Sequence, residues 1–199
     1  MFHAYLKEIL MNLRPYGKAV LILFVLSILI GATAFVIYPD LLIKILEVFQ
    51  DKFGADPVLN FALVLDIFKQ NLIASLIGLF GGLLLGLGSI LFVLFNGFII
   101  GYVITAVLVA GGQEGIIQGI KFLILGLAPH GIVEIPTFLV VSALGLRLGL
   151  FYLKKQNQGL RLQVFLKDLK LSLMAIPAIA ILLFLAALLE VFVTGSLLK

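Results

Sequence analysis

A run of 44 residues without Asp, Glu, Lys or Arg, from residue 70 to residue 113, constrains the fold of this chain more than any other feature. A helix needs about 20 apolar residues to cross the hydrocarbon core of a bilayer, so the run predicts two crossings joined by a turn. A soluble domain of 199 residues with 63% hydrophobic and 12% charged residues cannot bury that much apolar surface. We therefore expect a polytopic membrane protein, and neither a soluble enzyme nor a nucleic-acid-binding protein.

Three further apolar runs bring the expected number of spans to five. They cover residues 19–39, 122–146 and 171–189, while residues 70–113 supply the second and third spans. The predicted fold class is all-α: a single integral membrane domain over residues 1–199, built as a helical bundle.

The turn inside the 44-residue run has two candidate positions. Residues 86–89 and the Asn96-Gly97 pair both have the composition of a turn. We favour residues 86–89, because the amphipathic stretch 61–70 can extend the second span at its N-terminal side.

The basic residues lie in short segments between the apolar runs and predict an orientation. The N-terminal arm, residues 1–18, carries three basic residues, and the connection 147–170 carries six basic residues against one acid. Segment 40–69 carries five acids against three lysines. The positive-inside rule then predicts a multi-pass protein of the plasma membrane with a cytoplasmic N-terminus and an external C-terminus.

Segment 40–69 itself has the pattern of an amphipathic helix. Apolar residues recur at helical spacing with charges between them, up to a turn at residues 54–57. We expect an outer helical segment that lies in the interface or caps the bundle; a lid over a ligand is the alternative.

Fifteen of the 20 glycines lie between residues 78 and 149, and many are spaced four apart. In membrane helices this spacing lets two backbones approach closely. We favour packing within one chain; the alternatives are a homo-oligomer formed through the glycine-rich spans and helices that must bend. The sets spaced four apart are Gly82/Gly86, Gly97/Gly101, Gly111/Gly115/Gly119 and Gly145/Gly149.

One polar group stands out inside the fourth expected span. Glu134 lies near its centre, where a charge costs on the order of 3 kcal/mol, and His130 lies four residues earlier, on the same helical face. The flanking Pro129, Gly131 and Pro136 suggest a break in the helix that frees backbone carbonyls.

Three interpretations of this group remain open. It can be a buried His130–Glu134 pair, with Asn96 as a possible third member, that fixes helix register. It can handle protons or cations, or hold a divalent metal at His130 and Glu134.

Asn71 and Glu190, near the ends of expected spans, are expected at the membrane interface. The chain has no cysteine and no His-Glu-x-x-His, Walker or Rossmann sequence, so we expect no catalytic residues and no other cofactor.

Several of these residues resemble the stage II sporulation protein M family of integral membrane proteins over roughly residues 66–195. The resemblance rests on the Asn96-Gly97 pair with Gly101, on Pro129-His130-Gly131 followed by Glu134 and Pro136, and on the flanking stretches 71–75, 86–89 and 143–149. It implies a multi-span helical protein without established catalysis. The family's namesake belongs to an engulfment complex with cell-wall-degrading partners, but this chain has no sizeable soluble domain for such a partner.

The sequence therefore predicts a non-enzymatic membrane protein that acts as an oligomeric scaffold or binds other membrane proteins, with lipid as its surroundings. The alternative is a small ion or proton transporter or channel that uses His130 and Glu134 at the membrane midplane.

Overall fold

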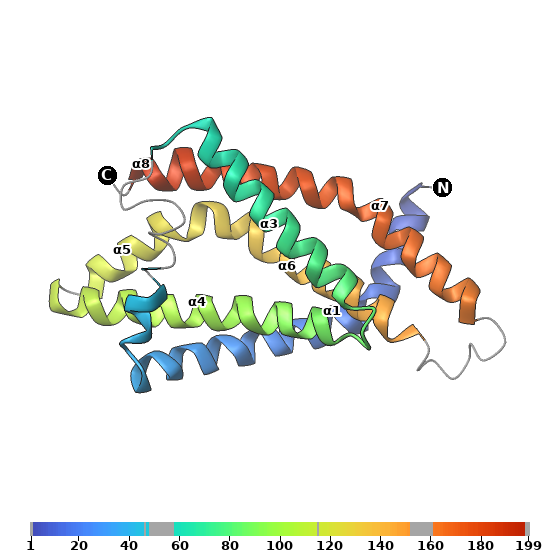
Figure 1. The fold of residues 1–199 in the computed structure, drawn as a ribbon, viewed down its shortest axis with the longest axis horizontal. Coiled ribbons are helices and arrows are strands. Elements are labelled where there is room, and N and C mark those ends of the chain that lie inside the picture. The colour runs from blue at the N-terminus through green and yellow to red at the C-terminus, as the bar shows by residue number, and fades with distance from the viewer. Residues whose placement is uncertain (1, 46, 48–57, 115, 152–160, 198–199) are drawn as a thin grey trace.

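The computed structural model describes residues 2–45, 47, 58–114, 116–151 and 161–197, and these residues form helices joined by short turns, with no strand among them. The long helices run side by side in a bundle (Figure 1). Their bounds are α1 Phe2–Ile37, α3 Phe61–Gly81, α4 Leu87–Glu114, α5 Ile116–Gly126, α6 Ala128–Gly149 and α7 Arg161–Leu188, followed by the π-helical turn η3 Leu189–Thr194 and α8 Gly195–Leu197.

Within the described residues, five helical segments are long and apolar enough to cross a membrane, which confirms the all-α, five-span prediction. Their outward faces carry large exposed apolar side chains, such as Ile22, Ile77 and Leu91, which suit contact with lipid acyl chains. The five segments are Leu13–Ile37, Phe61–Gly81, Leu87–Val109, Ala128–Gly149 and Arg161–Leu197.

The turn between the second and third spans occupies residues 82–86. Leu85 and Gly86 have positive φ angles of 61° and 81°, a conformation that glycine adopts without steric cost. Of the favoured segment 86–89, Gly86 lies in the turn and the other three residues begin α4, whereas Asn96-Gly97 lies well inside α4.

Helix α6 is the central element of the bundle. In its membrane-span window 61% of the residues are buried, against 22–28% in the other four spans. One apolar cluster joins α6 to α3 and α7 through Leu79, Phe138 and Leu183, and a second joins it to α1 and α4 through Val93 and Ala143. The other spans therefore surround most of α6, while Ile132 and Val140 remain exposed on its outer face.

Glycines allow two of these helix pairs to pack closely within the chain. A methyl group added at Gly101 would overlap the carbonyl oxygen of Ile28 in α1, and one at Gly97 would overlap Ser27 Oγ. At the other end of α4, Gly82 and the pair Gly145/Gly149 bring the end of α3 against α6. The surroundings of Gly111 and Gly115 are not described in the structure.

The segment after α1 packs back onto the bundle. Residues 41–45 and 47 are helical, and Leu41 and Ile45 contact the apolar cluster formed by Phe35, Tyr102 and Ala106. The Tyr102 hydroxyl donates hydrogen bonds to the carbonyl oxygens of Tyr38 at 2.8 Å and Pro39 at 3.1 Å. This part of the expected outer segment therefore caps the α1–α4 pair, while residues 48–57, which include the expected turn at 54–57, lie outside the described residues.

A buried ion pair joins the ends of α6 and α7. Arg147, which the sequence pattern assigned to the basic connection 147–170, lies in the last turn of α6 and is 6% exposed; Asp168 in α7 is 2% exposed. Arg147 Nε donates to Asp168 Oδ1 at 2.9 Å, and Nη2 lies 2.6 Å from the same oxygen. Arg147 Nη1 is buried without a hydrogen-bond partner among the described residues.

Candidate functional site

Three ionisable side chains from two helices converge inside the bundle. His130 and Glu134 project from α6, four residues apart on one face, and Glu190 projects from η3 at the end of the last span. One potential ligand atom of each residue lies within 4.8 Å of those of the other two. All three side chains are partly buried.

Two further polar side chains hold this group in place. Asn71 of α3 donates a hydrogen bond from Nδ2 to Glu134 Oε1 at 2.7 Å. Thr194 Oγ1 of η3 lies 3.3 Å from His130 Nδ1. The site is therefore built from α3, α6 and η3, and each of the two α6 residues has a polar neighbour on another helix. We call these five residues the polar site.

Proline chemistry places His130 at the start of α6. Pro129 has no N–H group and occupies the first turn of α6, where a helical donor is not needed. Its ring also disfavours a helix running through the preceding residues, so α5 ends at Gly126 and Leu127 forms a turn before α6 begins. The expected break thus lies just before Pro129, while Gly131 and Pro136 are inside α6.

Glu190 lies on an unusual backbone. Residues Leu189–Thr194 form a π-helical turn, and the Gly195 N–H donates to the Glu190 carbonyl oxygen, five residues back. Val191, Val193 and Thr194 are β-branched, which lowers their preference for a regular α-helix. The wider turn sets the direction in which Glu190 and Thr194 project, and π-helical turns inside α-helices are frequent at functional sites.

The two carboxyl groups cannot both be charged without compensation. Two unit charges within 4.8 Å of each other repel by roughly 3 kcal/mol or more at an effective dielectric constant of about 20. A carboxylate inside a membrane span also costs on the order of 3 kcal/mol by itself. Glu134 and Glu190 together therefore favour binding a proton or a cation between them.

The site lies deep in the α5–α6 segment. Together α5 and α6 cover residues 116–149, whose midpoint falls between residues 132 and 133, within two residues of Glu134. Within α6 alone, Glu134 is the seventh of 22 residues, about 9 Å along the helix from Ala128 at 1.5 Å per residue. Its depth in a membrane therefore depends on α5, a separate apolar helix before the break that is too short to cross a membrane by itself.

The other residues singled out in the sequence have different surroundings. Asn96 donates its amide to the Phe92 carbonyl oxygen of its own helix at 2.8 Å, and Gly97 and Gly101 pack against α1. At Gly131 an added methyl group would meet only ordinary contacts, 3.7 Å from Ile135 Cδ1 and 3.9 Å from Leu127 Cγ.

The sequence pattern placed Asn71 and Glu190 at the membrane interface and did not indicate Thr194. The expected spans were cut at charged residues, so Asn71 and Glu190 fell at span ends. In the structure α3 begins at Phe61, which places Asn71 mid-helix, and the last span continues past Glu190 to Leu197. The apolar residues on both sides of Glu190 are the signal that would have identified it.

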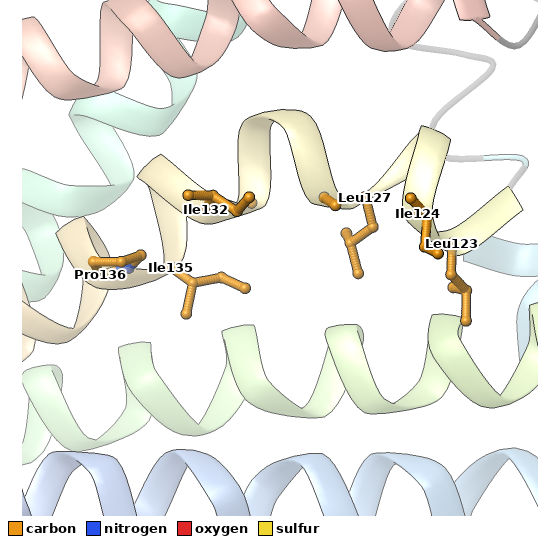
Figure 2. Close-up of a pocket in the computed structure, with 8 residues that line it drawn as sticks. Leu123, Ile124, Leu127, Ile132, Ile135 and Pro136 are labelled. Atoms are coloured by element: carbon orange, nitrogen blue, oxygen red, sulfur yellow. The ribbon is translucent and has the colours of Figure 1, made fainter. Parts of the chain in front are cut away.

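An open apolar hollow of about 520 Å³ lies at the break between α5 and α6. Figure 2 shows Leu127 and Ile135 directed toward the α4 side of the break, with Leu123 and Pro136 at its two ends. The residues that line this hollow are apolar and do not include His130 or Glu134. The hollow and the polar site are thus separate features of the same helix break.

Comparison with known proteins finds a matching family model and a similar protein. The family model described as stage II sporulation protein M matches residues 20–195. An uncharacterized protein of Methanocaldococcus jannaschii is 29% identical over 135 residues, which cover 66% of this chain and 70% of the relative. No solved structure matches the chain.

Proposed function

Because the chain belongs to the stage II sporulation protein M family, we propose that it is a multi-pass membrane protein that binds and transfers protons or small cations through the polar site. The convergence of His130, Glu134 and Glu190 within 4.8 Å carries this proposal. Ionisable groups are costly within a span, and those that are kept commonly lie on ion or proton pathways.

The backbone around the site supports the proposal. Pro129 and Pro136 cannot donate to the carbonyl oxygens four residues earlier, those of Leu125 and Ile132, so two backbone acceptors lose their helical partners close to the polar side chains. Interrupted membrane helices with such freed carbonyls coordinate ions in many transporters. We propose a binding and transfer role and no catalytic one, since the chain has no cysteine and no His-Glu-x-x-His, Walker or Rossmann sequence.

The test is ion flux through vesicles that contain the purified protein. We expect wild-type vesicles to dissipate an imposed proton or cation gradient faster than empty vesicles. Glu134→Gln, Glu190→Gln and His130→Ala should each lower that excess rate at least tenfold. Glu134→Gln should remain monodisperse in detergent, because Gln still offers an oxygen to Asn71.

Asp66→Asn is the matched control. Asp66 is an exposed acid on α3, five residues before Asn71, so the variant removes one charge without touching the site. Its flux should equal that of the wild type. Wild-type vesicles that are as tight as empty ones, for protons and for common mono- and divalent cations, would contradict the proposal.

A scaffold that binds other membrane proteins or further copies of itself is the second candidate. The apolar hollow at the α5–α6 break favours it, because a lipid-facing hollow of about 520 Å³ can accept apolar side chains from another helix. Gly97, Gly101, Gly145 and Gly149 already pack within the chain, so an oligomer would use a different face. Light scattering of the detergent-solubilised protein measures the copy number, and Ile132→Trp, which fills the hollow's rim, should lower it.

We further propose that the protein lies in the plasma membrane with the basic end of the bundle in the cytoplasm. The end that holds the start of α7 carries Arg161 with Lys167 and Lys170, while the opposite end begins the acidic segment at Asp40. This distribution follows the positive-inside rule.

A further inference from the structure

We propose that the polar site binds a divalent transition-metal ion, with zinc as the type, through one ring nitrogen of His130 and one carboxylate oxygen each from Glu134 and Glu190. This inference deepens the proposed function by naming the ligand of the same site. It gives Glu190 a role as third ligand, a role that the sequence pattern did not assign.

The donor set selects the class of ion. One imidazole nitrogen with two carboxylate oxygens suits zinc and neighbouring first-row metals, whereas magnesium and calcium prefer sites made of oxygen alone. Three protein ligands also leave a fourth position for water, as in zinc sites whose metal remains accessible. An exchangeable ion fits transfer better than a fully enclosed structural ion does.

The geometry is compatible with such an ion after small side-chain rotations. Ligand atoms held about 2.1 Å from a tetrahedral ion lie roughly 3.4 Å apart. The potential ligand atoms of the three residues already lie within 4.8 Å of one another. Each of these side chains has torsions that can close the remaining distance without movement of α6 or η3.

The outer contacts resemble those that orient metal ligands. A histidine ligand usually engages its second nitrogen in a hydrogen bond, and ligand carboxylates are themselves hydrogen-bonded. Here Thr194 Oγ1 lies 3.3 Å from His130 Nδ1, which leaves Nε2 for the ion. Asn71 donates to Glu134 Oε1, which leaves Oε2.

Charge balance distinguishes a divalent ion from a monovalent one. Two carboxylates and a neutral imidazole carry a charge of −2, so a divalent ion makes the site neutral, whereas a monovalent ion leaves one uncompensated charge inside the bundle. Because uncompensated charge in a membrane span is unfavourable, the site should hold a divalent ion more tightly.

Metal binding to the detergent-solubilised full chain tests this inference. After removal of metals with chelator, the wild type should bind one Zn²⁺ or Co²⁺ per chain, with Co²⁺ giving the visible absorption of a four-coordinate site. His130→Ala, Glu134→Gln and Glu190→Gln should each weaken binding at least 100-fold, and Asn71→Ala about tenfold. Asp66→Asn should bind like the wild type.

Folded wild-type protein that binds less than one metal per chain, or His130→Ala and Glu190→Gln variants that bind as tightly as the wild type, would overturn the inference. Should a Gln variant aggregate, Glu190→Asp keeps the charge and should still bind, more weakly. The metal site and the transfer function can be tested independently. If the protein binds metal but its vesicles are as tight as empty ones, the metal site stands and the proposed transfer function is contradicted. If the vesicles conduct protons but the protein binds no metal, the transfer function stands and the proposed metal site is contradicted.

Discussion

Arg147 and Asp168 illustrate at the scale of single residues how a charge can be both buried and tolerated. The charge of each side chain compensates the charge of the other in a buried region, where neither charge would be stable alone. The sequence pattern treated both as signals of topology, because a charge beside an apolar run looks the same whether it faces water or a partner. Only the packing of α6 against α7 separates the two cases.

Replacing one member of this pair should lower the stability of the fold strongly, while replacing both members should lower it much less. Arg147→Met leaves a buried carboxylate and should lower the free energy of unfolding by about 3–5 kcal/mol. The double variant Arg147→Met, Asp168→Leu should recover most of that loss. Unfolding in SDS followed by circular dichroism measures both, with the exposed Arg161→Met as control. A double variant no more stable than the single one would show that the pair has another role.

At the scale of helices, Gly101 of α4 and Gly131 of α6 should differ in how well they tolerate a methyl group. Gly101→Ala should destabilise the fold by about 1–3 kcal/mol, because the added methyl group would overlap the Ile28 carbonyl oxygen, and backbone atoms cannot move aside easily. Gly131→Ala should change stability by less than about 1 kcal/mol, since the methyl group finds ordinary contacts in α6. Thermal unfolding of the two variants in one detergent compares them directly; equal losses would contradict the proposed α1–α4 packing.

The helices were largely predictable, whereas their ends and partners were not. Apolar runs locate spans because lipid demands about 20 apolar residues per crossing, and this requirement is local in sequence. Charges such as Asp66 and Lys69, however, lie on the exposed face of α3 without ending it. The sequence therefore indicated Glu134 and His130, but the approach of Asn71 and Glu190 depends on how three helices pack, which no local pattern encodes.

The molecule as a whole should have one orientation that can be measured directly. The end of α1 and the start of α3 lie at one end of the bundle, and the start of α7 lies at the other (Figure 1). Because the chain has no cysteine, single cysteines introduced at Asp40 and Val58 can label the first end, and one at Arg161 can label the second. In intact cells a membrane-impermeant maleimide should label the cysteines at 40 and 58, and should label that at 161 only after lysis. The reverse pattern would show that the bundle is inverted.

The polar site draws on three distant parts of the chain, and this fixes the order in which it can assemble during synthesis. Asn71 emerges first, His130 and Glu134 follow, and Glu190 comes 56 residues after Glu134. At about 5–20 residues per second, the ribosome needs roughly 3–11 s to cover that interval. Until then α6 is present without its third site residue and without the helix that covers one of its faces. The insertion machinery must therefore accommodate an incomplete polar helix, and variants at Glu190 should be examined for yield in the membrane as well as for activity.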